Sequence, residues 1–381
     1  MMSDMENKRE IWIDWLRVVA CFMVMVVHST EPFYLGGDGA LIASRADALW
    51  VSFFDTLVRS CVPLVVIASS YLQFPLHYPT GEFFRRRAVR IVVPFAIWSV
   101  FYALYWGEPV SNFRDMLLNF NYAAGHLWFV YMIIGLYVLM PLLSPWAEKV
   151  GRRELDAYIA IWLFTTLIPL VRDWVAGPAQ VIYGPTGIPR QALFPLWGEA
   201  SWNAYGTFYY VSGFIGYLLV GLWLRKFGSG IFARRSFAFG VPCFLGGFAI
   251  CFLGFVCRVT ETAGGCYPVG GLVNDAVWWE TGWCNDTFGV AMMTIGAVLM
   301  LKNIRSCGKF YARVLLPVSQ ASYGMYLGHM VVLSAYSGLF RSLIPSTPLV
   351  IIITAIASFV TVAVVAVALQ RIPKLGKLII G

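Results

Sequence analysis

Long runs of apolar residues, separated by short polar segments, dominate the pattern along this chain. A helix needs about 20 mostly apolar residues to cross the hydrocarbon core of a bilayer. The runs are continuous, whereas the strands of a membrane β-barrel alternate apolar and polar residues. Ten runs approach the required length: residues 11–30, 49–74, 88–106, 127–144, 157–171, 205–224, 236–256, 286–301, 315–338 and 348–370.

This pattern predicts an all-α fold, a polytopic membrane helix bundle with about ten transmembrane helices. The composition agrees, because 59% of the residues are hydrophobic, only 13% are charged, and the mean hydropathy is +0.70. Soluble domains carry about 25% charged residues. We therefore expect one transmembrane domain over residues 11–370, preceded by a cytoplasmic segment, 1–10, and followed by a cytoplasmic tail, 371–381.

Basic residues gather in alternate connecting segments. If the N-terminus is cytoplasmic, twenty of the 28 Lys and Arg residues fall in inner segments. Because cytoplasmic loops are enriched in Lys and Arg, this distribution predicts ten spans with both termini inside the cell. The net charge of +8 then follows from membrane topology, and we expect no nucleic-acid partner.

The predicted outer segment 258–285 contains Cys266 and Cys284. A disulfide between them is chemically allowed in an oxidising compartment. Spacing alone does not fix cysteine pairing, so the sequence leaves this bond open.

Arg17 and His28 interrupt the first apolar run. They are eleven residues apart, so on an α-helix they lie within about 20° of the same face and about 16 Å apart along the axis. Charged groups in a membrane are costly and usually face the interior of a bundle. The pair therefore predicts the two ends of a passage through the bundle. The alternative is that Arg17 snorkels to the inner interface and His28 marks the outer one.

The third run opens with "RRAVRI", in which Arg87 and Arg90 are one helical turn apart. We expect them on one face at the cytoplasmic end, at the depth of Arg17. A guanidinium group binds phosphate through a planar, bidentate fork, so three of them would suit a phosphorylated cytosolic ligand. Ordinary basic anchoring on the inner side is the alternative.

Two further histidines, His126 and His329, fall at the outer depth of His28. Three imidazoles at one depth favour a site, although a lone histidine in a helix is more often a structural, hydrogen-bonded group. We expect no metal, because three ligands on separate helices without motif spacing do not resemble a zinc site. Sequence motifs of soluble hydrolases, metalloproteases and nucleotide-binding loops are absent.

Several segments resemble the acyltransferase family 3 membrane proteins, over residues from about 9 to 370: "IWIDWLRVVACFMVMVVHS", "RRAVRI", "GHLWFVYMIIGLYVLMPLL" and "SYGMYLGH". That family carries Arg, ten residues, then His, matched here by Arg17 and His28, and an Arg-x-x-Arg pair, matched by Arg87 and Arg90. One departure is "IASSYL", where the family more often has a Ser-Gly pair. This departure puts the close packing of the second predicted helix in question.

The resemblance implies a multi-pass O-acyltransferase of the bacterial inner membrane. Such an enzyme moves an acyl group, commonly acetyl and sometimes a longer group such as succinyl, from cytosolic acyl-CoA to a hydroxyl of an envelope glycan or a lipid-linked sugar. By this resemblance Arg17, Arg87 and Arg90 would bind the coenzyme, and His28, with Arg17, would be catalytic. His28 would act as general base or carry the acyl group itself.

Side chains at the outer depth are candidates for contacts with the acceptor or the oxyanion: His126, Trp128, Tyr131, Tyr323 and His329. Asp55 could orient an imidazole, or it could pair with Arg59 four residues later. A separate periplasmic partner protein is compatible with this interpretation. The alternatives are a transporter or flippase of an anionic glycolipid, with the histidines as a proton relay, and a structural subunit of an envelope assembly.

Overall fold

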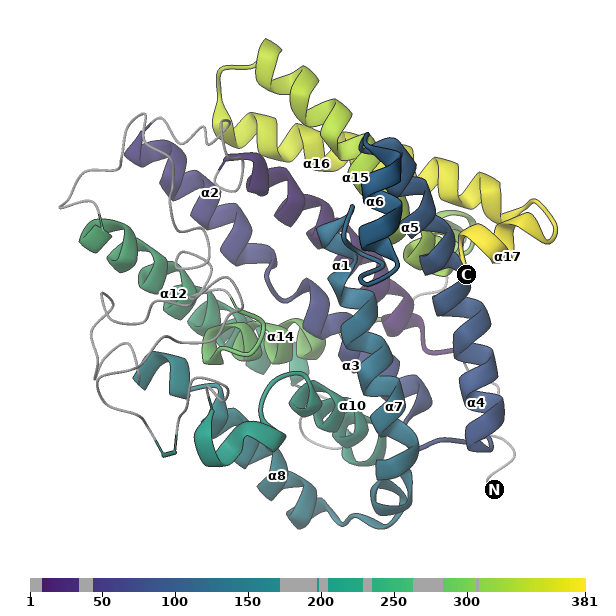
Figure 1. Ribbon diagram of the computed structural model, residues 1–381. Coiled ribbons are helices and arrows are strands. Elements are labelled where there is room, and N and C mark those ends of the chain that lie inside the picture. Colours follow the sequence, from purple (N-terminus) through teal and green to yellow (C-terminus); the bar gives the residue numbers. More distant parts are fainter. Residues whose placement is uncertain are drawn as a thin grey trace.

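The computed structural model describes residues 9–33, 44–171, 197–198, 205–228, 235–262, 284–305 and 308–381. Within these ranges all regular structure is helical and no strand occurs, which confirms the all-α class (Figure 1). The α-helices are α1 (Ile11–Thr30), α2 (Arg45–Val58), α3 (Cys61–Gln73), α4 (Thr80–Arg87), α5 (Val93–Tyr105), α6 (Pro109–Met116), α7 (Trp128–Lys149), α8 (Arg152–Thr165), α10 (Ile215–Phe227), α12 (Ser236–Thr262), α14 (Phe288–Leu301), α15 (Leu316–Leu343), α16 (Thr347–Gln370) and α17 (Leu375–Ile379).

Short turns of other helical types adjoin them: the 3₁₀ turns η2 (Glu31–Phe33), η5 (Gly125–Leu127) and η7 (Gly206–Val211), and the π turns η4 (Ala88–Val92) and η9 (Tyr311–Leu315). Cys266 lies outside the described residues, so the question of a disulfide with Cys284 stays open.

Seven helical stretches in the described part of the chain are long and apolar enough to cross a membrane, so the protein is a multi-pass membrane protein by length and composition. Three predicted runs do not belong to these seven. Helices α10 and α14 have only 13 and 14 residues. Helix α15 is long enough but carries several Ser and Tyr residues and one Gln, which make it more polar. The number of ten spans and the cytoplasmic position of both termini stay predictions.

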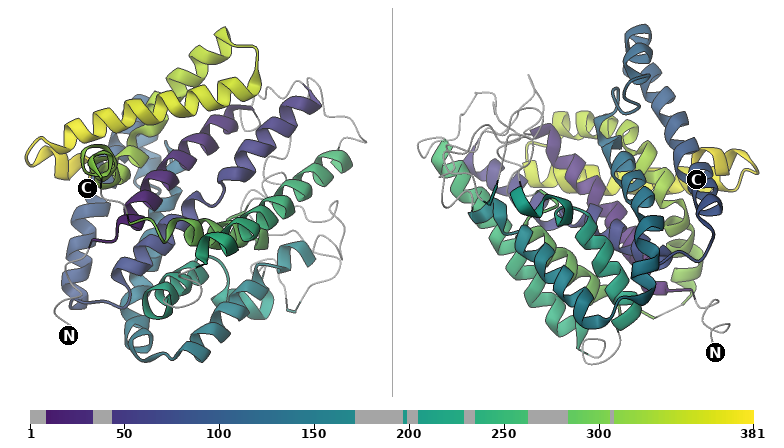
Figure 2. Two further views of the ribbon diagram at one scale, coloured as in Figure 1. Left: turned by 180° about the vertical axis from the view of Figure 1, so that it is seen from behind. Right: turned by 60° about the horizontal axis from the view of Figure 1, so that its bottom comes forward.

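Helix α1 occupies the middle of the bundle. It packs against α2, α3, α15 and α16, and the left view of Figure 2 shows it running between α16 and α2. Leu16, Ala20 and Met25 are fully buried along it. A polar side chain on α1 therefore has protein, not lipid, on most sides, which is the condition that Arg17 and His28 require.

The segment "IASSYL" in α3 packs closely on its neighbours despite the second serine. The hydroxyl groups of Ser69 and Tyr137 lie 2.9 Å apart, and the Ser70 hydroxyl donates to the carbonyl oxygen of Leu218 at 2.5 Å. Gly221 on α10 leaves the necessary space, because a Cβ atom there would lie only 2.5 Å from the Cβ of Ser70. Small residues at such contacts let membrane helices approach closely.

Both π turns precede a proline by two residues, Pro94 after η4 and Pro317 after η9. Proline lacks the N–H group that would close the regular bond to the residue four positions earlier, which is Arg90 in η4. A wider turn forms instead. The turn that contains Arg90 is therefore wider than in the regular helix predicted there, yet Arg87 and Arg90 still line one cavity.

Helices α12 and α14 pack closely against each other through facing glycines. A Cβ atom added at Gly296 would lie 2.6 Å from the backbone N of Phe244 and 2.7 Å from the carbonyl O of Gly240. Real Cβ atoms do not approach backbone this closely, so the helices would have to move apart.

We expect Gly296→Ala to lower the free energy of unfolding by about 1–3 kcal/mol, because it overpacks this contact. Gly254→Ala on α12 is the control, since a Cβ atom there meets nothing within 4 Å; it should be neutral or slightly stabilising, because alanine favours helix over glycine. Thermal unfolding in detergent measures both variants. Equal melting temperatures would contradict the close contact.

Candidate functional site

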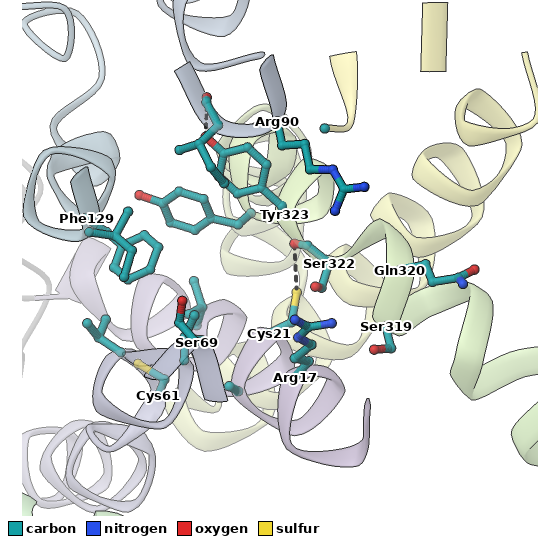
Figure 3. A pocket seen from close by; sticks show the side chains of 18 of the residues that line it. Arg17, Cys21, Cys61, Ser69, Arg90, Phe129, Ser319, Gln320, Ser322 and Tyr323 are labelled. Carbon is teal, nitrogen blue, oxygen red and sulfur yellow. Dashed lines mark hydrogen bonds between the residues drawn. The ribbon is translucent and has the colours of Figure 1, made fainter. Parts of the chain in front are cut away.

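A cavity of about 230 Å³ lies inside the bundle between α1, α3, α7, α15 and the region of η4 (Figure 3). Arg17, Arg87 and Arg90 line it, as do Val24 and Phe129. Because Val24 is seven residues beyond Arg17 on α1, the cavity extends about 10 Å along that helix. It therefore joins a basic region to an apolar and aromatic one.

The three arginines reach this cavity from different elements. Figure 3 shows the side chains of Arg17 and Arg90 entering from opposite sides, from α1 and from η4. The guanidinium carbon of Arg87 lies 5.6 Å from the ring centroid of Tyr137, and its buried Nε has no hydrogen-bond partner within the described ranges. No ion pair to a carboxylate is formed by any of the three in the described part of the chain. The cavity therefore presents guanidinium groups that no described carboxylate side chain pairs with, and these groups can bind an anion.

Asp14, one turn before Arg17 on α1, has its oxygens occupied by other groups. Arg9 donates to it at 2.7 and 2.8 Å, and the hydroxyl groups of Tyr311 and Ser319 each donate at 2.7 Å. A carboxylate with this many donors is stable in a buried position. It ties the start of α1 to η9 and α15 and does not pair directly with Arg17.

The structure brings His28, His126 and His329 together from α1, η5 and α15. Ring centroids are 4.9 Å apart for His28 and His329, 5.0 Å for His126 and His329, and 6.2 Å for His28 and His126. The side chain of His329 is fully buried, and that of His126 nearly so. The three histidines predicted at one depth thus form one cluster, whose chemical role the geometry does not test.

Hydrogen bonds fix two of these rings. His28 Nδ1 lies 2.5 Å from Oε2 of Glu31, and His329 Nδ1 lies 2.5 Å from the carbonyl oxygen of Tyr326, to which it must donate. The Nε2 atoms of His126 and His329 are buried without a partner among the described residues. Unpaired buried polar atoms cost about 1–3 kcal/mol each, so these two nitrogens point to a ligand that supplies the missing bonds.

Two aromatic side chains stand between the cavity and the histidine cluster. Tyr326 and Phe129 both line the cavity, and their ring centroids are 5.3 Å apart. The Tyr326 ring is stacked 5.9 Å from His329, and its hydroxyl donates to the carbonyl oxygen of His126 at 2.5 Å. His28 itself does not line this cavity. The predicted passage from Arg17 to His28 is therefore not continuous in this structure, and the Phe129–Tyr326 pair borders the cavity where Tyr326 contacts His329.

Three of the other predicted contact residues lie elsewhere. Trp128 is 40% exposed and packs against Phe214, and the hydroxyl of Tyr131, also exposed, accepts a bond from the backbone N–H of Phe120. Tyr323 lines the basic cavity and donates to the carbonyl oxygen of Ile91 in η4. The structure thus leaves Trp128 and Tyr131 outside the histidine cluster, in contact with Phe214 and Phe120 instead.

Of the two roles open to Asp55, the structure shows the ion pair. Arg59 Nη2 lies 2.5 Å from an oxygen of Asp55, and the Thr30 hydroxyl lies 3.3 Å from the other oxygen. The carboxylate that contacts an imidazole is instead Glu31. Sequence reasoning missed it, although the spacing of three residues from His28 was an available signal.

Comparison with known proteins identifies the family. A family model described as an acyltransferase domain matches residues 10–368. No curated protein and no solved structure matches the chain. The matched range contains the three arginines of the cavity and the three clustered histidines. Since the match covers nearly the whole chain, this multi-pass membrane protein belongs to acyltransferase family 3.

Proposed function

We propose that this protein is an O-acyltransferase of the bacterial inner membrane, which moves an acyl group, acetyl in the simplest case, from cytosolic acyl-CoA to a hydroxyl of an envelope glycan or a lipid-linked sugar. One observation carries the proposal: unpaired guanidinium groups line a cavity that is separated from three clustered imidazoles by one aromatic layer. Such an enzyme must bind the phosphate groups of the coenzyme, and it must move the proton of the acceptor hydroxyl to the leaving thiolate.

The arginine end of the cavity suits the donor. Coenzyme A is a polyanion with phosphate groups at one end and a slender, uncharged pantetheine arm at the other. Arg17, Arg87 and Arg90 offer charge-assisted hydrogen bonds to the phosphates. The apolar walls beyond them, which include Val24 and Ile133, suit the arm. In this proposal the thioester lies at the Phe129–Tyr326 end.

The Phe129–Tyr326 pair has to move before the thioester can meet His28. Tyr326 is held by one hydroxyl bond and by ring contacts, and a rotation of its side chain would join the two compartments. Rotations of this kind need no change in the helix backbone. We propose that binding of the acyl-CoA and the acceptor favours this open arrangement.

Imidazole chemistry then completes the transfer. His28 takes the proton of the acceptor hydroxyl, whose oxygen forms a bond to the thioester carbonyl carbon. The carbon–sulfur bond breaks, and the leaving coenzyme thiolate receives the proton from the imidazolium. His329 offers Nε2 as an acceptor, because its Nδ1 donates to Tyr326. It would hold the acceptor hydroxyl, and a separate periplasmic protein could pass the product to a larger glycan.

We expect His28→Gln to lower kcat by about 10²- to 10⁴-fold, because it removes the general base. Release of free CoA from labelled acetyl-CoA by purified protein, with an added sugar acceptor, measures this. His77→Gln is the control, since His77 contacts Arg225 and lies outside the histidine cluster. Undiminished turnover in His28→Gln would refute the proposed role. Absence of CoA release by the native protein would favour the glycolipid transporter instead.

We expect Arg90→Gln to weaken acyl-CoA binding by about 10- to 100-fold, the equivalent of one or two lost charge-assisted hydrogen bonds. Calorimetric titration with CoA measures the affinity. Arg85→Gln is the matched control, because Arg85 lies on α4, is exposed and does not line the cavity. Equal affinities in the two variants would contradict the phosphate site.

A further inference from the structure

The carboxylate of Glu31 has no part in the chemistry described so far, although it contacts His28. Its Oε2 lies 2.5 Å from His28 Nδ1, and the two side chains are only 22% and 12% exposed. A charge-assisted bond of this length in a largely buried place is strong. The carboxylate of Glu31 is therefore placed to affect which nitrogen of His28 carries the proton and how well the positively charged ring is stabilised.

The backbone holds Glu31 in position. Its N–H bonds to the carbonyl oxygen of Val27, which continues the hydrogen-bonding of α1 by one residue. Pro32 follows and fixes its own φ, and Phe33 is buried in the core at 4% exposure. Glu31 thus sits on a short anchored turn, η2, where its side chain has few alternatives to the His28 contact.

The bond determines which nitrogen of His28 carries the proton. An ionised carboxylate can only accept, so the neutral imidazole must be protonated on Nδ1. Its Nε2 then carries a lone pair on the side of the ring away from Glu31. No described residue hydrogen-bonds to this Nε2. The nearest imidazole is that of His329, at 4.9 Å between ring centroids.

Other charges near the cluster are already paired. Asp55 is bound to Arg59 and to the Thr30 hydroxyl, and within the described ranges no ion pair is formed by His126 or His329. Glu31 is thus the acid, among the residues described, that can balance a positive charge forming on His28. Its contact with His28 distinguishes Glu31 from the carboxylates at the surface.

We propose that Glu31 is the positioning residue for His28 in the acyl transfer, an inference that rests on the proposed function. It keeps the proton of the neutral ring on Nδ1 and stabilises the imidazolium that forms when Nε2 accepts the proton of the acceptor hydroxyl. The Nδ1 proton stays in place, and Nε2 returns the other proton to the departing thiolate. No further reactant is needed.

The test compares Glu31→Gln with Asp47→Asn. Asp47 is a matched control, because it is an acid at the start of α2 that binds the hydroxyl groups of Ser44 and Thr347 and no histidine. We expect Glu31→Gln to lower kcat by about 10- to 10³-fold, with an unchanged KM for acyl-CoA, while Asp47→Asn keeps the native kcat. The double variant His28→Gln/Glu31→Gln should be no slower than His28→Gln alone, because the two residues act as a unit.

A spectroscopic measurement separates orientation from a structural role. Ring nitrogens of ¹⁵N-labelled histidine should report a single Nδ1–H tautomer for His28 in the native protein and a mixture in folded Glu31→Gln. Native kcat in Glu31→Gln, or a lowered kcat with an unchanged tautomer, would overturn the inference. If His28→Gln itself kept turnover, the proposed function would fail first, so the two failures are distinguishable.

Discussion

An ionisable side chain within a membrane must find protein partners or a polar cavity, because its transfer to the bilayer centre costs about 3 kcal/mol on insertion scales. Helix α1 carries Asp14, Arg17 and His28, and four helices surround it. Each of the three side chains is accommodated inside the bundle in a different way. Asp14 is satisfied by Arg9 and two hydroxyls, His28 by a carboxylate, and Arg17 by the internal cavity.

Around α1 these side chains belong to two regions with different chemistry, the basic cavity and the histidine cluster. The basic cavity is lined by three arginines, and the histidine cluster has two buried nitrogens without a hydrogen-bond partner among the described residues. Both are incomplete in the way that binding sites are, since a folded protein leaves few buried polar atoms unpaired without cause. Under the proposed function, Phe129 and Tyr326 would keep a bound thioester apart from the imidazoles until the acceptor is present, which would limit hydrolysis.

Local rules explain which parts of this arrangement could be predicted. The length of the apolar runs predicts the helices, and helical spacing places Arg17 and His28 on one face of α1. The same rules assume a regular helix across Arg87 and Arg90, where the chain forms a π turn before Pro94, although both side chains line one cavity. They also grouped Trp128 and Tyr131 with the histidines by depth alone, although depth carries no information about the face from which a side chain projects.

The sequence by itself determined the all-α class and the membrane character, because these depend on residues close together in the chain. Only the tertiary structure decided that the rings of three histidines from α1, η5 and α15 lie within 6.2 Å of one another, and that Tyr326 borders both these rings and the cavity. The neighbours of a helix within the membrane depend on packing between segments that are distant in the sequence. Such contacts produce no periodic pattern in a single sequence.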